Sequence, residues 1–361
     1  MSIAEYFSPD YVSARERFRA AAAGAAAATL SHVLPDHRGP AGETLSLDIA
    51  RLGAEDARSA LLVIAGTHGV EGLAGSGCIV GLLEDRLHEA LAPDSCLVLL
   101  HALNPYGYAW LRRVTEDGVD LNRNFVDFSK PLPPSQAYEP LHDWLVPKAW
   151  QGEVRQAADA ALGAHVQKHG MTSLQAAVSS GQYTRPGGLF YGGIRETWSA
   201  RMLLRTLREV LPATVRRLSV LDLHTGLGPS AYGELILDTA DPKARERALR
   251  WYGADVRDLS AGESVSARLT GTMARGIERA RPELELTFVA LEFGTRPVMD
   301  VLTALRADHW LHSHGGGDPA AAPQIRRQMR DAFYTDTAAW KAAVYGRSAD
   351  IAFRGLRGLA A

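Results

Sequence analysis

The sequence AGTHGVEGLAGSG, residues 65–77, joins an apolar run to a turn that carries two polar side chains. The run that leads into it, ALLVIAG (60–66), is typical of a buried strand. In the turn, His68 and Glu71 stand three positions apart among five glycines. Glycine lets the backbone turn sharply, so both side chains can converge on one point. Imidazole nitrogen and carboxylate oxygen are both zinc ligands, and the pair therefore predicts part of a zinc site.

Further apolar runs alternate with helical patterns along the chain. We expect buried strands at 60–66, 96–104, 217–226, 233–238 and 286–294, and helices near 75–92, 195–211, 241–252 and 297–313. Strands separated by helices predict an α/β fold with a mixed, largely parallel central sheet and helices on both faces. The segment 126–195 breaks this alternation, because it is proline-rich and then alanine-rich. We therefore expect a single domain, 1–361, with an insertion at about 126–195 beside the sheet.

The composition is that of a soluble globular enzyme, with 22% charged and 46% hydrophobic residues among 361. A net charge of −2 at pH 7 does not favour nucleic acid as a partner, and no apolar run approaches the ~18 residues of a membrane span. Acids and arginines precede an alanine-rich run at the N-terminus, which is the wrong order for a signal peptide. We expect an amphipathic helix there, starting at Ser8-Pro9, and a cytoplasmic protein whose Cys78 and Cys96 are free, buried thiols.

The run SVLDLHTGLG (219–228) supplies a second polar strand end. Asp222 and His224 are two apart in the predicted strand, so their side chains share a face. A lone histidine at such a position is more often structural. Beside His68 and Glu71, however, His224 completes a His/Glu/His set, which leaves a catalytic zinc an open position for water. Asp222 is then either an acceptor that orients a ligand imidazole or a solvated, capping aspartate.

A third predicted strand, LTFVALEFGT (286–295), carries a glutamate among apolar residues. Glu292 would be costly there if it were unpaired, and an arginine partner is the simple structural explanation. The catalytic interpretation is a carboxylate that takes a proton from water and whose surroundings raise its pKa. Because three strand ends each deliver a suitable polar residue, the sequence favours the catalytic interpretation.

The run RRVTEDGVDLNRNF (112–125) holds several charged and amide side chains. Asn122 and Arg123 could hold a substrate carboxylate, because arginine offers a bidentate fork. Arg112 or Arg113 could stabilise an oxyanion, and Arg112 is also a candidate for binding the substrate. Taken alone, the run would be a charged surface loop.

Together these motifs resemble the zinc metallocarboxypeptidase family, the carboxypeptidase A-like peptidases, which is related to the succinylglutamate desuccinylase/aspartoacylase group. The resemblance covers about residues 60–300, and GVDLNRNF (118–125) is its most specific element. It implies a carboxypeptidase-type fold of the phosphorylase/hydrolase kind and one Zn²⁺ per chain. The site residues that the resemblance implies are the zinc ligands His68, Glu71 and His224, the general base and acid Glu292, the carboxylate-binding Asn122 and Arg123, the oxyanion-stabilising Arg113 with Arg112 as its alternative, and Asp120 bonded to the first zinc histidine.

Two features depart from that family. The interval between His68 and His224 is longer than usual, and the segment 126–195 accounts for the difference. This segment and GQYTRPGGLFYGG (181–193) make the chain most similar to a bacterial branch of the family. No tyrosine can be assigned to the mobile loop that sets specificity in carboxypeptidase A-like enzymes, and the candidates, each more often structural, are Tyr183, Tyr191 and Tyr232.

These residues predict hydrolysis of an amide bond next to a free carboxylate, with a small peptide as the favoured substrate. The alternatives are a deacylase of N-acyl amino acids or small amides, and a non-catalytic binding protein on the same scaffold. A serine esterase is disfavoured, because HGGG (314–317) is not followed by a G-x-S-x-G nucleophile motif. A second metal at His309, His312 and His314 is disfavoured as well, since their spacing suits capping and packing. The sequence does not determine the oligomeric state.

Overall fold

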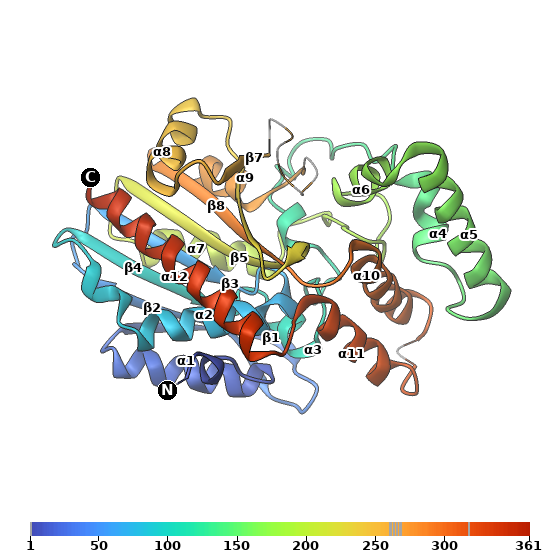
Figure 1. Cartoon of the computed structure of the whole chain (residues 1–361), viewed down its shortest axis with the longest axis horizontal. Helices are drawn as coiled ribbons and strands as arrows, with labels where there is room; N and C mark the ends of the chain where they lie inside the picture. The colour runs from blue at the N-terminus through green and yellow to red at the C-terminus, as the bar shows by residue number, and fades with distance from the viewer. Residues whose placement is uncertain (1, 260–261, 263, 265, 267–268, 317) are drawn as a thin grey trace.

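A computed structural model describes the chain apart from residues 1, 260–261, 263, 265, 267–268 and 317. Among the described residues, eight strands form one sheet in the order β1-β2-β4-β3-β5-β8-β6-β7 (Figure 1). The strands are β1 (Ala28–Arg38), β2 (Thr44–Gly53), β3 (Ser59–Ala65), β4 (Ser95–His101), β5 (Arg217–Ser230), β6 (Gly233–Leu237), β7 (Val256–Asp258) and β8 (Glu285–Gly294). The central strands β4, β3, β5 and β8 pair in parallel, whereas β1–β2, β2–β4 and β6–β8 are antiparallel. The predicted mixed, largely parallel α/β sheet is confirmed: its central strands are parallel, and β6 and β7 also pair in parallel at one edge.

Helices cover both faces of this sheet, as predicted. In Figure 1, α12 lies across the front of the sheet and α7 lies behind it. The helices are α1 (Tyr11–Gly24), α2 (Gly72–Glu84), α3 (Pro105–Trp110), α4 (His142–Leu145), α5 (Gly152–His169), α6 (Met171–Ser179), α7 (Trp198–Glu209), α8 (Pro242–Tyr252), α9 (Met273–Ala280), α10 (Val298–Ser313), α11 (Ala322–Phe333) and α12 (Ala338–Ala360). Within the described part of the chain, no helix has both the length and the apolar character that crossing a membrane requires.

The outer elements differ from the sequence-based prediction. The first helix begins at Tyr11 rather than at Ser8-Pro9, because Asp10 caps it by accepting a hydrogen bond from the Ser13 N–H at 2.8 Å. The prediction lacks β1, β2 and β7. Most side chains of β1 are exposed, as suits a strand at the edge of a sheet, so it has no apolar run. β7 has only three residues.

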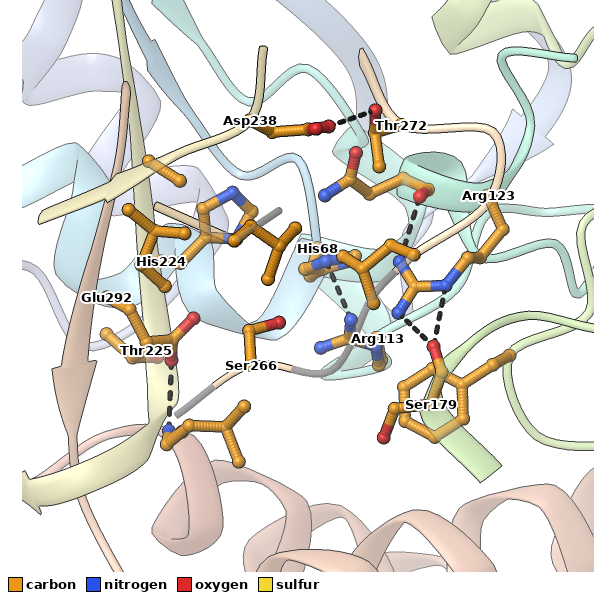
Figure 2. A pocket seen from close by; sticks show the side chains of 18 of the residues that line it. His68, Arg113, Arg123, Ser179, His224, Thr225, Asp238, Ser266, Thr272 and Glu292 are labelled. Atoms are coloured by element: carbon orange, nitrogen blue, oxygen red, sulfur yellow. Dashed lines mark hydrogen bonds between the residues drawn. The ribbon is translucent and has the colours of Figure 1, made fainter. Parts of the chain in front are cut away.

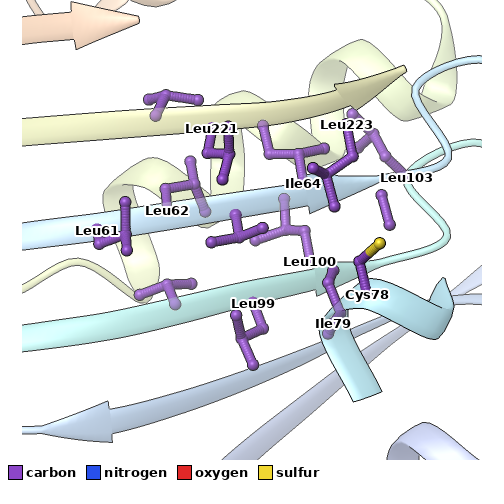
Figure 3. Packing of buried hydrophobic residues seen from close by; sticks show 14 of the residues in the cluster. Leu61, Leu62, Ile64, Cys78, Ile79, Leu99, Leu100, Leu103, Leu221 and Leu223 are labelled. Atoms are coloured by element: carbon purple, nitrogen blue, oxygen red, sulfur yellow. The ribbon is translucent and has the colours of Figure 1, made fainter. Parts of the chain in front are cut away.

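The main core surrounds the central strands β3 and β4. Every residue of both strands is buried, because the middle of the sheet is covered on both faces. Aliphatic side chains of β3, β4 and β5 pack side by side, among them Leu61, Leu99 and Leu221 (Figure 3). Burial of one such side chain contributes about 1.5–3 kcal/mol. Cys78 and Cys96 are free and buried in this core, as expected.

The segment 126–195 contains α4, α5 and α6 and packs against α10 and α11. Figure 1 shows these five helices together at one end of the sheet. Leu174 and Leu189 from the segment join Leu305 and Phe333 in a hydrophobic cluster distinct from the main core. The segment is therefore held by its own apolar contacts at the end of the sheet where β5 carries its polar residues.

The turn after β3 packs closely against the end of α3. The Gly69 N–H donates to the Arg113 carbonyl at 3.2 Å. A Cβ atom on Gly69 would lie 2.0 Å from the carbonyl carbon of Gly107, so a larger residue does not fit. This close approach brings His68 and Glu71 beside the Arg113 side chain.

Gly69→Ala is expected to destabilise the protein by about 2–4 kcal/mol, because the backbone of Gly107 cannot move aside as a flexible side chain can. Urea denaturation followed by circular dichroism would record this as a lower midpoint. Gly163→Ala in α5 is the matched control: its Cβ meets no atom within 4 Å, and it should raise stability by about 1 kcal/mol. An unchanged midpoint in Gly69→Ala would contradict the close approach.

Candidate metal centre

Three buried side chains with metal-binding atoms meet at the ends of β3 and β5. His68 follows β3, Glu71 lies in the short 3₁₀ turn Gly69–Glu71, and His224 lies in β5. The two strands pair in parallel, so both deliver their polar residues to the same edge of the sheet. One nitrogen or oxygen atom from each of the three residues lies within 4.8 Å of the others. The structure thus brings together the residues that the sequence predicts as zinc ligands. Two of them, His68 and His224, are labelled in Figure 2.

Carboxylates face both ring nitrogens of His224. Its Nε2 lies 2.7 Å from Asp222 Oδ2, and its Nδ1 lies 3.1 Å from Glu71 Oε2. The other oxygen of Asp222 accepts a hydrogen bond from the Thr67 hydroxyl at 2.7 Å. Burial opposes a charge on His224, but the two carboxylates outweigh it and raise the pKa of the imidazole well above its usual value. Asp222 therefore contacts the imidazole of His224, as expected for an acceptor that orients this candidate metal ligand.

The guanidinium of Arg113 lies among the same groups. It donates to Glu71 Oε1 at 3.0 Å, to His68 Nε2 at 2.7 Å and to Asp120 Oδ2 at 2.9 Å. Burial and the charge of Arg113 hold the pKa of His68 well below its usual value, so its imidazole is neutral. A cationic group therefore already lies against a carboxylate and a neutral imidazole, the two kinds of group that bind a metal ion.

The donor set fits a zinc ion. Two imidazoles and one carboxylate are a ligand set of catalytic zinc sites. Nδ1 of His68 is buried without a hydrogen-bond partner among the described residues, and Asp120 Oδ1 lies 3.6 Å from it. Burial opposes the charge on Asp120, but the positive charge of Arg113 outweighs it and lowers the pKa of this carboxyl far below its usual range. Asp120 thus faces His68, as the family resemblance implies.

Glu292 stands on β8 directly opposite His224 in the register of the two strands. Its Oε1 accepts a hydrogen bond from the Leu227 N–H at 2.9 Å, and its side chain lines the same pocket as His68 (Figure 2). Burial, together with the nearby charge of Glu71, raises the pKa of Glu292 to about 7. A carboxyl group with this pKa can both accept and donate a proton near neutral pH.

Asn122 and Arg123 line the pocket beside these residues. Arg123 donates through Nε and Nη2 to the Ser179 carbonyl, at 3.0 and 2.6 Å, and through Nη1 to the Asn122 carbonyl at 2.8 Å. The ring of Phe190 lies near both arginines, with its centroid 5.1 Å from the guanidinium carbon of Arg113 and 5.4 Å from that of Arg123. Two backbone carbonyls therefore fix the direction of the Arg123 guanidinium, and the Phe190 ring lies against both arginines.

The sequence does not single out Ser179 and Phe190, although both line the pocket. Both belong to the segment 126–195. Phe190 has a φ of 52°, in the left-handed region, and its carbonyl accepts the Gln182 N–H at 3.1 Å. The sequence pattern that could have indicated Phe190 is an aromatic residue among the glycines of GGLFYGG (187–193), which is typical of a functional loop.

Arg112 is not brought to the pocket. Its guanidinium forms a buried ion pair with Asp308 of α10, with Nη2 3.0 Å from Oδ2. The physical reason is that a buried carboxylate requires a positive partner, and Arg112 supplies it. Of the two arginines proposed for an oxyanion, Arg113 is the one at the site, and the substrate-binding role predicted for Arg112 has no support in this geometry.

The three candidate tyrosines do not line the pocket among its described residues. Tyr183 donates its hydroxyl to the Arg123 carbonyl at 2.7 Å, so it supports the backbone next to the site. Tyr191 is buried, and Tyr232 is exposed. None of the three is therefore positioned as a substrate contact here.

The histidines of α10 contact groups other than a metal-binding cluster. Nδ1 of His309 lies 2.9 Å from the Gly187 carbonyl, and Nε2 of His312 lies 3.6 Å from an oxygen of Asp308. These contacts suit the packing role that their spacing indicates. The last residue of HGGG (314–317) lies outside the described residues.

The chain belongs to the family described as Protein of unknown function (DUF2817), whose model matches residues 7–347. No curated protein matches the sequence. Solved structures with some similarity include an aspartoacylase family protein from Mesorhizobium loti MAFF303099, at 16% identity over 80% of this chain and 67% of that chain with a TM-score of 0.37. They also include Fimbriiglobus ruber glutaminyl cyclase (11% identity, 99% and 91% of the two chains, TM-score 0.42) and bovine thrombin-activatable fibrinolysis inhibitor (12%, 99% and 99%, TM-score 0.47). Identities of this size carry no activity over to this chain.

Asp222→Asn is expected to weaken zinc binding about 10–100-fold, because an amide orients the His224 imidazole less firmly than a carboxylate does. Competition with a chromogenic chelator measures the zinc Kd. Ser219→Ala is the matched control on the same strand: its hydroxyl contacts Tyr252 at 2.8 Å, far along β5 from the centre, and its Kd should be unchanged. Equal zinc affinity in Asp222→Asn and the wild type would refute the orienting role.

Proposed function

We propose that this protein is a zinc-dependent hydrolase that cleaves an amide bond next to a free carboxylate. The observation that carries the proposal is the convergence of the His68, Glu71 and His224 donor atoms within 4.8 Å of one another, beside a pocket that Glu292 and Arg113 also line. His68, Glu71 and His224 would hold one zinc ion. When bound, zinc lowers the pKa of a water ligand to about 7 and polarises the carbonyl that is attacked.

Glu292 is the proton-transfer group in this proposal. Its carboxylate lines the pocket beside the candidate ligands, so it can accept a proton from the attacking water and return it to the departing amine. The Leu227 N–H, bonded to Oε1, leaves the other carboxylate oxygen for this exchange. Proton transfer by a positioned side chain typically contributes ~10²–10⁴ to the rate.

The two arginines supply the positive charge that the reaction needs. Arg113 lies nearest the candidate metal ligands, so its guanidinium would stabilise the oxyanion that forms on the attacked carbonyl. Arg123 contacts backbone carbonyls and forms no ion pair within the described residues, so its charge is available to the carboxylate of a substrate. Asn122 would add an amide donor beside it.

Peptides and N-acyl amino acids both present an amide bond next to a free carboxylate. A metallocarboxypeptidase and an N-acyl amino acid deacylase therefore differ only in what precedes the scissile carbonyl. The segment 126–195 contributes Gln175, Ser179 and Phe190 to the pocket wall, which supports a role for this insertion in substrate choice.

Glu292→Gln is expected to lower kcat by about 10²–10⁴ for short peptides with a free carboxyl terminus or for N-acetyl amino acids. The glutamine side chain cannot accept the proton from water as the carboxylate does. Zinc content should stay at the wild-type level, since Glu292 is not among the metal-binding donors. The measurement is amine release by the zinc-loaded protein.

Glu285→Gln is the matched control, because Glu285 is an exposed residue at the start of the same strand. Its kcat should equal that of the wild type. Full activity in Glu292→Gln would reject the proton-transfer role. Wild-type protein that binds zinc and carboxylates but cleaves neither substrate would instead favour the non-catalytic binding protein.

A further inference from the structure

An apolar crevice opens between α6 and α10, next to the candidate metal centre. Ten of its twelve lining residues are apolar. Leu174 and Val178 form the wall on α6, and Val298 and Leu302 form the wall on α10. Val298 and Met299 are large apolar side chains that stay 39% and 36% exposed, so apolar surface continues to the outer rim.

The crevice is continuous with the metal-binding pocket. Six residues line both spaces, among them Phe190, Leu227 and Leu305. Leu227 donates its N–H to Glu292, and Phe190 lies over Arg113. A ligand held at the metal centre can therefore extend directly from these catalytic groups into the crevice.

The amino-acid end of a substrate is expected on a different side of the centre. Figure 2 shows Asp238 and Thr272 on one side of His68 and Ser179 on the other. Asn122 belongs to the first side, because its Oδ1 accepts the Met273 N–H at 2.8 Å. Arg123 spans the two sides, because its Nη1 donates to the Asn122 carbonyl and its Nε and Nη2 donate to the Ser179 carbonyl. A substrate carboxylate bound on the Asn122 side of this guanidinium leaves the opposite end of the substrate free to reach the crevice.

The lining indicates what kind of group the crevice takes. Only Gln175 and Ser179 of the lining residues are polar, and the Ser179 carbonyl already accepts two hydrogen bonds from Arg123. A peptide backbone would bring N–H and C=O groups into the crevice, where buried polar groups without partners are costly. A hydrocarbon chain needs no such partners and gains free energy from burial.

We propose that the substrate is an N-acyl amino acid whose acyl group is an aliphatic chain of medium length, and that this chain lies in the crevice between α6 and α10. The inference rests on the proposed amide hydrolysis and names its substrate class. The reaction adds water across the amide bond and releases a fatty acid and an amino acid. The acyl chain would begin beside Leu227 and Phe190 and extend between the apolar walls formed by α6 and α10.

The test compares the N-acetyl, N-hexanoyl and N-decanoyl derivatives of one amino acid with the zinc-loaded full-length protein. Each buried methylene should raise kcat/KM by about threefold to fourfold until the crevice is filled. The hexanoyl compound has four methylenes more than the acetyl compound, so it should exceed it by about tenfold if two of them are buried and by about a hundredfold if all four are. Equal values, or a preference for acetyl, would overturn this proposal while the proposed hydrolysis stands. Turnover of none of the three would count against both.

A peptide substrate tests whether the apolar group must be an acyl chain or can be the side chain of a peptide. An N-acetyl dipeptide with leucine before the scissile bond carries a comparable number of apolar carbons on a peptide backbone. It should be cleaved more slowly than the N-hexanoyl amino acid. A peptide that is cleaved faster would reject the acyl-chain assignment in favour of a carboxypeptidase.

Two variants and a binding measurement locate the effect in the crevice. Met299→Glu should bring the ratio of decanoyl to acetyl kcat/KM down toward one, because a carboxylate would replace apolar surface at the rim. Val154→Glu is the matched control, since Val154 is a 50% exposed apolar residue on α5 outside the crevice, and it should keep the wild-type ratio. Calorimetry on the Glu292→Gln protein should show the decanoyl compound binding about tenfold or more tightly than the acetyl compound. Equal affinities there would contradict the proposal without any reference to activity.

Discussion

The buried carboxylate of Glu71 is the group on which the rest of the site depends. One of its oxygens accepts from Arg113, and the other accepts from the Thr225 N–H and contacts His224. Removing one partner from a buried ion pair of this kind costs about 3–5 kcal/mol. Segments that lie far apart in the sequence must therefore keep their relative positions. The parallel pairing of β3 with β5, and the close approach of Gly69 to α3, make that geometry possible.

The electrostatics of the site follow from the same arrangement. Glu71, Asp120 and Asp222 are buried together around the candidate centre, with Arg113 as the cation in direct contact with two of them. Burial and the charge of Glu71, one of these carboxylates, raise the pKa of Glu292. A divalent cation would balance the negative charge and would free Arg113 for a developing oxyanion. The buried carboxylates therefore favour a bound cation at this end of the sheet.

The central part of the fold could be predicted from the sequence because its strands are buried on both faces and show as apolar runs. The edge strand β1 could not, since its side chains face solvent and its pairing with β2 is a long-range property. The candidate ligands were predictable because each follows or ends such a run. The choice between Arg112 and Arg113 was not, because it depends on Asp308, a residue of α10 that is distant in sequence. Phe190 was hidden for the same reason, since its place over Arg113 depends on how a loop folds back.

The most direct test of the central claim is the zinc content of the purified protein, measured by mass spectrometry after saturation with zinc and removal of the excess. The wild type is compared with Glu71→Ala and His224→Ala, and circular dichroism confirms that each variant is folded. The account predicts one zinc ion per chain in the wild type and loss of that ion in both folded variants. Zinc that is retained in both variants, or that never binds to the wild type, would contradict it.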